Sequence, residues 1–376
     1  MRILMICPSL QIRSEWLFTL INNLKEDIAY VATNEINLER IDLPQQNLNP
    51  LYSKIIRRID EGLNQKYIYT AILNGLEQNF NTTINYVHFL SFAVNFKNFI
   101  FNSTSPTLIH CHGKDIMWDL KKIESGEDYH SDAYFRDVKE LAKHAFFIAN
   151  SNFTRNQLLK MGIEKSKIFI NHFGIELKEK SKNPTDNIFR ILYLGRLVDF
   201  KGPLETIDAF EKSCDLGLKG ELIIAGGGEL EDKCKEKIEK SKYRSNIQML
   251  GWVDKAQAQS LYNKCDIFTA HNKIDSYTNQ VEAFGVTIIE AMSYGLPVVT
   301  GRSGGVSDSV VNGETGYLIE PGNIDTHAKT FLDLYRNKDL RDRLSKNSRA
   351  RIKNYFCLQK EKEGLQNIIN QTIQNY

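Results

Sequence analysis

Several features that mark common protein classes are missing from this sequence. Its 376 residues contain no Cys-x-x-Cys pair, and no apolar run approaches the ~20 residues that a membrane-spanning helix needs. Scattered cysteines argue against a disulfide framework or a structural zinc site, and they predict free thiols in a reducing cytoplasm. The six cysteines are Cys7, Cys111, Cys214, Cys234, Cys265 and Cys357.

An excess of charge of one sign is absent as well. The chain has 48 basic and 46 acidic side chains, for a net charge of +2. A general nucleic-acid-binding function is therefore excluded, because such proteins need a positive excess to neutralise phosphates. The N-terminal segment MRILMICPSL lacks a small-residue cleavage pattern, so we predict a buried first strand there rather than a signal peptide.

Short apolar segments alternate with amphipathic helical patterns along almost the whole chain. Such strands are typical of parallel sheets with helices on both faces. We predict an α/β fold of two Rossmann-like, doubly wound domains that face each other across a cleft, with ligands outside the carboxyl ends of the strands. The predicted strands are Arg2–Cys7, Ile28–Ala32, Ile84–Phe89, Thr107–His110, Ala145–Ala149, Lys167–Ile170, Phe189–Leu194, Gly220–Ala225, Ile247–Leu250, Ile267–Ala270, Pro297–Thr300 and Gly316–Ile319.

A polar stretch near the middle of the chain, KEKSKNPTDN at residues 178–187, interrupts this alternation and predicts a linker. It separates an N-terminal domain, residues 1–180, from a C-terminal domain, residues 188–357. Apolar positions near the end of the chain predict a last helix over residues 358–376. Other predicted helices are Glu15–Leu24, Phe153–Met161, Pro203–Lys212, Leu230–Ser241 and Ala328–Tyr335.

The segment VEAFGVTIIEAMSYGLPVVT, residues 281–300, carries the strongest functional signal. It places Glu282 before, and Glu290 within, a helix predicted to begin near Val286 and to end at Gly295. The free N–H groups and the positive dipole end of that helix suit a diphosphate. Glu290, one turn into the helix, would reach a ribose, and Glu282 would reach hydroxyls on the other side. The alternative is that both are ordinary charged residues.

A second segment, LYLGRLVDFKG at residues 192–202, ends a predicted strand and turns at Gly195. Arg196 and Lys201 therefore lie in a loop at the carboxyl end of a strand, where anions bind in such folds. A guanidinium and an ammonium suit a diphosphate whose charge grows as it leaves. Two solvated loop cations are an equally good interpretation of this segment alone.

Three further turns are rich in glycine. IIAGGGEL, residues 223–230, allows close backbone approach at Gly226, Gly227 and Gly228, and Glu229 is predicted to open the next helix, although the segment lacks the further glycine of a dinucleotide fingerprint. Gly251 in LGWV presents a backbone edge suited to a nucleobase. SGGVSD at residues 303–308 is another place for backbone contact. Each turn is also explained by loop geometry without a ligand.

The segment LIHCHGKD, residues 108–115, ends a first-domain strand with two histidines. His110 and His112 lie on one face of an extended strand. We interpret His112 as a cleft residue that touches substrate and His110 as a packed core residue. The pair also suits a metal ion, but the sequence offers no obvious third ligand.

A basic stretch between residues 51 and 69 contains Lys54, Arg57, Arg58 and Lys66 among apolar residues. It predicts either a surface for an anionic membrane or acceptor, or a solvated helix, and the solvated helix is favoured.

Four of these segments, GRLVDFKG, IIAGGGEL, EAFGVTIIE and SGGVSD, occur in this order. Together they resemble the nucleotide-sugar glycosyltransferases of glycosyltransferase family 4, which have the GT-B fold. The similarity covers residues 188–335, and the first half matches only at its opening strand, LIHCHG, IANSNFTRNQLLKMG and NHFGIE. It implies two Rossmann-like domains and a final helix that crosses back to the first domain.

The resemblance also implies an activity. A hexose would move from a UDP- or GDP-sugar, the UDP-sugar being favoured, to a hydroxyl of a saccharide, lipid-linked saccharide or small molecule in glycan biosynthesis. The anomeric configuration would be retained, with no metal and no cofactor. The enzyme would be cytoplasmic, or peripheral on the inner face of the membrane.

The resemblance assigns Arg196 and Lys201 to the diphosphate and Glu290 to the ribose hydroxyls. Glu282 would hold the donor hexose, and His112 would contact the donor sugar from the opposite domain. No protein nucleophile is expected. The other predicted donor-binding residues are Gly195, Gly228, Glu229, Gly251, Ala283, Phe284, Gly285, Val286 and Thr287.

The sequence departs from the family in three places. The loop after the first strand reads PSLQIRSEW instead of carrying two glycines, Phe173 replaces a frequent asparagine, and Asp308 replaces a commoner glutamate. A nucleotide-sugar epimerase, a sugar phosphorylase and a non-catalytic sugar-nucleotide-binding protein are the alternative functions on the same scaffold. The hexose, the acceptor and the oligomeric state are left open.

Overall fold

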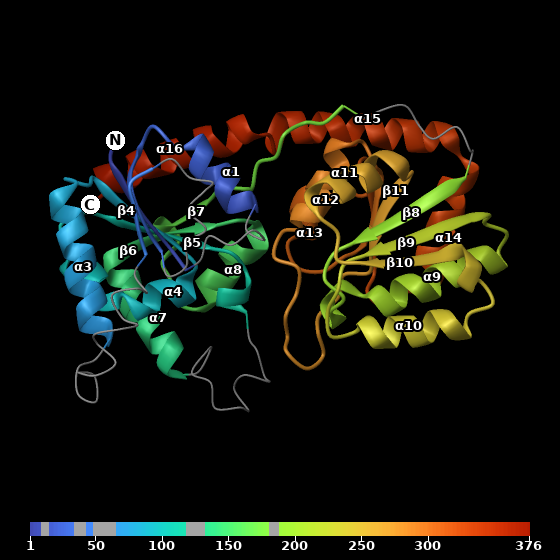
Figure 1. Cartoon of the computed structure of the whole chain (residues 1–376), viewed down its shortest axis with the longest axis horizontal. Helices are drawn as coiled ribbons and strands as arrows, with labels where there is room; N and C mark the ends of the chain where they lie inside the picture. The colour runs from blue at the N-terminus through green and yellow to red at the C-terminus, as the bar shows by residue number, and fades with distance from the viewer. Residues whose placement is uncertain (9–14, 34–42, 48–64, 118–131, 180–187) are drawn as a thin grey trace. The chain divides into compact units, whose positions relative to one another are not determined.

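The computed structural model describes residues 1–8, 15–33, 43–47, 65–117, 132–179 and 188–376 (Figure 1). The chain forms two compact units. The first contains residues 1–172 together with 361–376, and the second contains residues 173–360. The units part at Phe173, ahead of the polar stretch predicted as the linker, most of which lies outside the described residues.

The first unit is built on one sheet of seven strands in the order β3-β2-β1-β4-β5-β6-β7. All of its strand pairs are parallel. Every residue of the strands β1, β4 and β5 is buried, as expected for a sheet covered on both faces. The strands are β1 (Ile3–Cys7), β2 (Ile28–Thr33), β3 (Gln45–Asn47), β4 (Ile84–His88), β5 (Thr107–Cys111), β6 (Ala145–Ala149) and β7 (Ile168–Ile170).

The last helix of the chain, α16 (Leu358–Gln374), contributes to the core of the first unit. Its apolar face, with Leu365, Ile368 and Ile369, belongs to the same buried cluster as β1 and α1 (Glu15–Asn23). The spacing of these residues places them on one side of a helix. The other helices of this unit are α3 (Gln65–Asn79), α4 (Leu90–Asn95), α5 (Lys97–Asn102), η3 (Lys114–Ile116), α7 (Asp132–His144), α8 (Asn152–Lys160) and η4 (Lys165–Lys167).

The second unit has a six-stranded parallel sheet in the order β10-β9-β8-β11-β12-β13. Its strands are β8 (Phe189–Leu194), β9 (Gly220–Ala225), β10 (Ile247–Gly251), β11 (Ile267–Ala270), β12 (Val298–Gly301) and β13 (Gly316–Ile319). Its helices are η5 (Asp199–Lys201), α9 (Pro203–Asp215), α10 (Glu231–Lys240), η6 (Arg244–Asn246), α11 (Lys255–Lys264), α12 (Val286–Ser293), α13 (Val306–Ser309), α14 (Ile324–Arg336) and α15 (Lys338–Tyr355).

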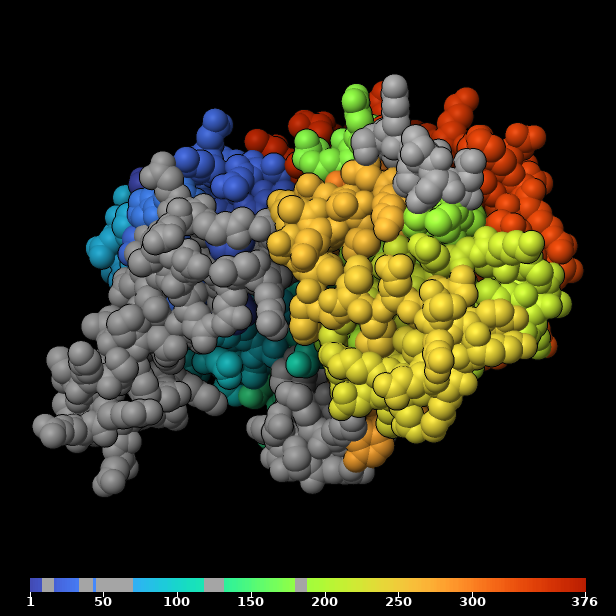
Figure 2. Space-filling view, turned by 45° about the vertical axis from the view of Figure 1, so that its right-hand side comes forward, coloured from blue at the N-terminus to red at the C-terminus, as the bar shows by residue number. Residues whose placement is uncertain are grey.

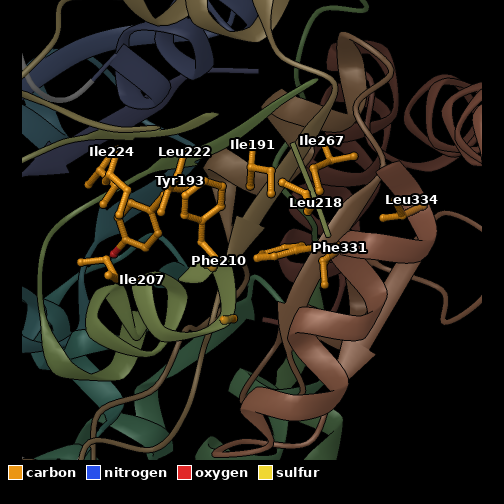
Figure 3. Close-up of a cluster of buried hydrophobic side chains, with 14 of the residues drawn as sticks. Ile191, Tyr193, Ile207, Phe210, Leu218, Leu222, Ile224, Ile267, Phe331 and Leu334 are labelled. Atoms are coloured by element: carbon orange, nitrogen blue, oxygen red, sulfur yellow. The ribbon is translucent and has the colours of Figure 1, made fainter. Parts of the chain in front are cut away.

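The core of the second unit lies between this sheet and the helices α9 and α14 (Figure 3). Tyr193 of β8 and Phe210 of α9 are almost completely buried, as is Phe331 of α14. Burial of a side chain of this size stabilises a fold by about 1.5–3 kcal/mol. The charged helix α10 has only one fully buried residue, Cys234, and its segment forms part of the outer surface (yellow in Figure 2).

Both sheets share a strand order that fixes where a ligand binds. The order reverses next to the first strand of each unit, between β1 and β4 and between β8 and β11. In open parallel sheets, the crevice outside the carboxyl ends of the strands at such a switch point holds the ligand. In the second unit, this crevice lies between the loops that follow β8 and β11.

The strand predictions are confirmed. Every predicted strand is present, with each end within one residue of the predicted end. One strand, β3, was not predicted, because its sequence, QQN, has no apolar residue. Helix α14 begins earlier than predicted, since the Asn323 side chain accepts the Thr326 N–H and caps the helix there.

Candidate active site

The loop after β8 is fixed by backbone hydrogen bonds to the next turn. The Gly195 N–H donates to the Ala225 carbonyl, and the Leu197 N–H donates to the Gly227 carbonyl, each over 3.0 Å. The Tyr193 hydroxyl donates to the Arg196 carbonyl over 2.9 Å. The loop that carries Arg196 is therefore held in one conformation at the carboxyl edge of the sheet.

Close packing accounts for two of the three glycines in the turn after β9. A Cβ atom at Gly226 would lie 1.9 Å from the Gly195 oxygen, and one at Gly228 would lie 2.5 Å from the Leu197 oxygen. These glycines allow the two loops to touch. Glu229 is exposed and precedes α10, which begins at Glu231, so Glu229 does not open the helix as the sequence suggested.

Gly251 lies at the end of β10, beside the same turn. Its carbonyl accepts the Gly226 N–H over 2.7 Å. With φ of 65° and no atom within 4 Å of a Cβ placed there, Gly251 leaves an open space on one side of the backbone. The next residue, Trp252, is 60% exposed.

Lys201 and Glu282 form an ion pair between the loops after β8 and β11. The Lys201 Nζ lies 2.6 Å from Glu282 Oε2, and the two side chains are only 15% and 14% exposed. Burial raises the pKa of the Glu282 carboxyl, but the Lys201 ammonium, with smaller contributions from Arg196 and the Phe284 N–H, lowers it below its ordinary value. The carboxylate is therefore ionised.

Arg196 is exposed, unlike Lys201. Its guanidinium carbon lies 5.5 Å from the centroid of the Phe200 ring. A guanidinium stacked on an aromatic ring keeps its N–H donors available at the ring edge. At the switch point, Lys201 thus pairs directly with the Glu282 carboxylate, and Arg196 also helps to lower the pKa of that carboxyl.

Helix α12 begins beside this ion pair. Its N-cap residue, Gly285, has φ of 90°, and Val286 and Thr287 are partly exposed in the first turn. The first N–H groups of a helix have no partner within the helix, so this end attracts an anion.

The SGGVSD turn holds the backbone in front of α12. The Gly305 N–H donates to the Glu282 carbonyl over 2.8 Å. A Cβ atom at Gly304 would lie 2.0 Å from the same oxygen. Packing against Glu282 therefore explains Gly304 without a ligand contact, whereas Gly305 contributes only its N–H group.

Glu290, in the middle of α12, is paired with a residue that sequence reasoning missed. Its Oε2 accepts a hydrogen bond from the Tyr262 hydroxyl over 2.8 Å. The Tyr262 ring stacks on Tyr294 at a centroid distance of 5.2 Å. Burial raises the pKa of the Glu290 carboxyl, and the Tyr262 hydroxyl and Lys255 only partly oppose this. No local pattern links α11 to α12, so Tyr262 could not be identified from the sequence.

Lys273 is a second residue that sequence reasoning missed. Its Nζ lies 2.8 Å from Asp199 and 2.6 Å from Glu205, and its N–H donates to the Phe200 carbonyl. It connects the loop after β11 to the short helix η5, which contains Lys201.

Phe173, one of the departures from the family pattern, packs against a predicted donor-binding residue. The centroid of its ring lies 5.9 Å from that of Phe284, which also meets Phe356 at 5.6 Å. The backbone carbonyl of Asp308, another departure, accepts a hydrogen bond from the Arg351 guanidinium.

His112 lies in the first unit, whereas all other predicted site residues lie in the second. It follows β5, and its N–H donates to Asp115 Oδ1 over 3.0 Å. The predicted basic stretch lies mostly outside the described residues, as does most of the loop after β1. Among the described helices, none combines the length and apolarity required to cross a membrane.

Known proteins resemble this chain over part of its length. Residues 175–351 match the family described as Glycosyl transferases group 1. The capsular polysaccharide biosynthesis glycosyltransferase CapM of Staphylococcus aureus is 30% identical over 243 residues, which are 62% of this chain and 60% of CapM. The amylovoran biosynthesis glycosyltransferase AmsK of Erwinia amylovora is 25% identical over 59% of this chain and 53% of its own length. The chain thus matches somewhat more than half the length of these relatives.

Solved structures share the whole fold. Anabaena Alr3699/HepE, crystallised with UDP, matches with a TM-score of 0.78 and 18% identity over 99% of this chain and 100% of its own. A glycosyltransferase from Rickettsia africae matches with a TM-score of 0.79 and 19% identity over 100% and 99% of the two chains. The chain has the two-domain, Rossmann-like GT-B fold, and residues 175–351 match the model of the group 1 glycosyl transferases.

Proposed function

We propose that this chain is a retaining, metal-independent glycosyltransferase that moves a hexose from a nucleotide diphosphate sugar to a hydroxyl acceptor in glycan biosynthesis. The acceptor is a saccharide, a lipid-linked saccharide or a small molecule. The observation that carries the proposal is the Lys201–Glu282 ion pair beside the first turn of α12, at the switch point of a group 1 glycosyl transferase domain.

A uridine diphosphate sugar is the donor that we favour. Two of the structures with the same fold are described as complexes of Anabaena Alr3699/HepE with UDP and with UDP-glucose. The open side of Gly251, next to the exposed Trp252, leaves room for a base at the edge of the sheet.

Each of the site residues of the second unit has a role in this proposal. Arg196, Lys201 and the first N–H groups of α12 neutralise the diphosphate as it leaves, which is why we propose that no metal is needed. Glu290 accepts hydrogen bonds from the ribose hydroxyls. Glu282 holds the donor hexose. When the donor binds, the Lys201 ammonium interacts with the phosphate as well as with Glu282.

The proposed reaction uses no protein nucleophile. The acceptor hydroxyl attacks on the face from which the diphosphate departs, and the held geometry lowers the entropic barrier. The bond between the anomeric carbon and the diphosphate oxygen breaks, and its electron pair stays on that oxygen. The proton of the acceptor hydroxyl passes to the leaving diphosphate. His112 of the first unit contacts the donor sugar.

The test is incubation with a panel of UDP-, GDP- and ADP-sugars, with and without acceptors, in the presence of a chelator. We expect free nucleoside diphosphate together with a glycosylated product whose anomeric signal in NMR matches the donor. Formation of a sugar phosphate from a disaccharide and inorganic phosphate would identify a phosphorylase. If no sugar is transferred and one stereocentre of the donor's sugar is inverted, in the intact or the hydrolysed donor, the enzyme is an epimerase.

We also propose a cytoplasmic location, peripheral to the membrane if the Lys54–Lys66 stretch binds anionic lipid. The six cysteines, all within the described residues, are free thiols, which fits a reducing compartment. Flotation with anionic liposomes tests the membrane contact, and a lack of salt-sensitive binding contradicts it.

A further inference from the structure

Three histidines meet at the carboxyl ends of β4 and β5 in the first unit. His88 ends β4, and it is paired in register with His110 of the neighbouring parallel strand β5. Residues opposite each other in register point to the same face of a sheet, and so do residues two positions apart on one strand. His112 follows His110 at that spacing, so all three imidazoles gather on one face.

The nitrogens of the three rings are close enough to share one ion. One ligand nitrogen from each of His88, His110 and His112 lies within 4.8 Å of the other two. The shortest separation, between His88 Nδ1 and His112 Nε2, is 3.1 Å. Two nitrogens on one tetrahedral Zn²⁺ are about 3.4 Å apart, because each Zn–N bond is about 2.0–2.1 Å long. The rings lie partly stacked, with interplanar angles of 16° between His88 and His112 and 29° between His110 and His112, so the side chains have to rotate for their nitrogens to converge on one ion.

The surroundings fix the positions of these rings. The buried Asp115 carboxylate accepts the N–H groups of His112, Gly113 and Leu90, at 3.0, 2.8 and 2.7 Å, and so holds the loop after β5 against the segment after β4. The hydroxyl of Tyr86 lies 2.7 Å from His110 Nδ1. A hydrogen bond to the outer nitrogen of a ligand histidine is the usual way to orient that ring.

The backbone beside His88 is also strained. Phe89 has φ of 70°, which a residue with a side chain rarely adopts. Its ring packs against His112 at a centroid distance of 4.3 Å. Strain of this kind is found where a site needs a fixed geometry.

We propose that His88, His110 and His112 form a Zn²⁺ site, with water at the fourth position. Imidazole is a preferred ligand of Zn²⁺, and three protein ligands with one open position form a common type of zinc site. The ion would join the end of β4 to the end of β5. The site shares His112 with the proposed function, in which this residue contacts the donor sugar, but none of the residues proposed to bind the diphosphate belongs to it. The inference does not depend on the proposed function.

The test uses the full chain, freed of metal with a chelator and measured without any donor. Zn²⁺ is titrated against a chromophoric competitor, and Co²⁺ serves as a spectroscopic probe of nitrogen coordination. We expect one Zn²⁺ per chain, visible Co²⁺ bands typical of tetrahedral coordination, and a higher Tm with Zn²⁺. His88→Phe and His110→Phe keep an aromatic ring but remove the nitrogens, and each should weaken Zn²⁺ binding at least about 100-fold.

His144→Phe is the matched control, because His144 is exposed on α7 and lies outside the cluster. It should bind Zn²⁺ as the parent chain does. Wild-type protein that gives only the spectrum of hydrated Co²⁺ overturns the proposal, and this measurement needs no variant to fold. Unchanged Zn²⁺ affinity in folded His88→Phe and His110→Phe, judged by circular dichroism, overturns it too. A zinc-binding chain without transferase activity would refute only the proposed function.

Discussion

The ammonium of Lys201 lies 2.6 Å from the carboxylate of Glu282, in a place where both side chains are largely shielded from water. The two residues come from loops on either side of the switch point, so the pair joins the halves of the crevice. A shielded charge pair is stronger than an exposed one, because little solvent screens it. The ion pair also holds the Lys201 ammonium beside Glu282 before a donor arrives.

Lys201→Met is therefore expected to lower kcat/KM for sugar transfer by about 100- to 1,000-fold, the usual cost of removing one donor to a developing oxyanion. The variant also leaves the Glu282 carboxylate without its main partner, which adds repulsion toward the phosphates. Steady-state kinetics with the preferred donor measures the effect.

Lys212→Met is the control for this change. Lys212 forms an exposed ion pair with Asp325, and such pairs contribute about 0–1 kcal/mol. Its kcat/KM should stay within about twofold of the parent value, since exposed pairs contribute so little. Equal rates for Lys201→Met and Lys212→Met would remove Lys201 from the proposed diphosphate site.

Glu290→Gln is expected to weaken binding of the nucleoside diphosphate by about 10- to 100-fold, since a hydrogen bond to a charged group contributes about 1.5–3 kcal/mol. The glutamine keeps the shape of the side chain and still accepts the Tyr262 hydroxyl. Because burial disfavours the ionised carboxyl of Glu290, the variant should not lose stability. Isothermal titration with UDP and thermal unfolding test both statements.

Glu236→Gln, a change at an exposed position of α10, is the matched control and should leave UDP affinity unchanged. If Glu290→Gln binds UDP as tightly as this control does, the ribose contact assigned to Glu290 is wrong.

The sequence located the site loops better than the contacts that fix them. Strand ends and glycine turns were predictable, because apolar runs and turn residues act over a few positions. Tyr262 and Lys273 were not, since each meets its partner through tertiary packing. His88 was missed as a neighbour of His110 for the same reason, as strand register cannot be counted along one sequence.

The glycine turns were easy to locate in the sequence, but their role was not. The sequence suggested that Gly228 and the Gly304–Gly305 pair approach a ligand. In the structure, the positions of Gly228 and Gly304 are occupied on one side by the backbone of Leu197 and of Glu282. A glycine needed for packing and one needed for a ligand look alike in a single sequence.

A buried histidine pair gives the second unit a pH-dependent stability. His271 Nε2 accepts the Gly322 N–H, so the proton of His271 lies on Nδ1 and is donated to His327 Nδ1 over 2.8 Å. His327 then carries its proton on Nε2 and donates it to Thr269, whose hydroxyl donates to the Val299 carbonyl. The chain of hydrogen bonds is complete only when both rings are neutral.

Burial lowers the pKa of His271 and of His327 from the ordinary value of 6.5, and the two rings lie against each other. Glu205 and Lys273 act on His271 in opposite directions. Below about pH 6.5 the unfolded chain binds protons that the folded chain does not. The free energy of unfolding therefore decreases as the pH is lowered, by up to about 1.4 kcal/mol per pH unit for each histidine. Above this pH the contribution is fully present.

His327→Phe should be less stable than the parent chain near pH 7.5, but it should lose less stability between about pH 7.5 and about pH 5.5. Urea unfolding at the two pH values measures the difference. The exposed His144→Phe variant should show the parent's pH dependence. An identical loss in His327→Phe and in the parent would show that the pair does not titrate with unfolding.

Gly226→Ala tests whether the loops after β8 and β9 must touch. The new Cβ would lie 1.9 Å from the Gly195 oxygen, and the residue has φ of 133°. The Gly195 N–H is hydrogen-bonded to the Ala225 carbonyl at the same place, so we expect the loop that carries Arg196 to shift. Misplacement of a charged group by about 1 Å can cost about 100-fold in rate.

Gly313→Ala separates this steric effect from backbone strain. Gly313 has φ of 78°, but no atom lies within 4 Å of its Cβ position, so only the strain of a positive φ is expected, about 1–2 kcal/mol. Gly226→Ala should be less stable than Gly313→Ala in urea unfolding and should lose transfer activity, whereas Gly313→Ala should keep it. If both variants lose equal stability and retain activity, the contact between the two loops does not position Arg196.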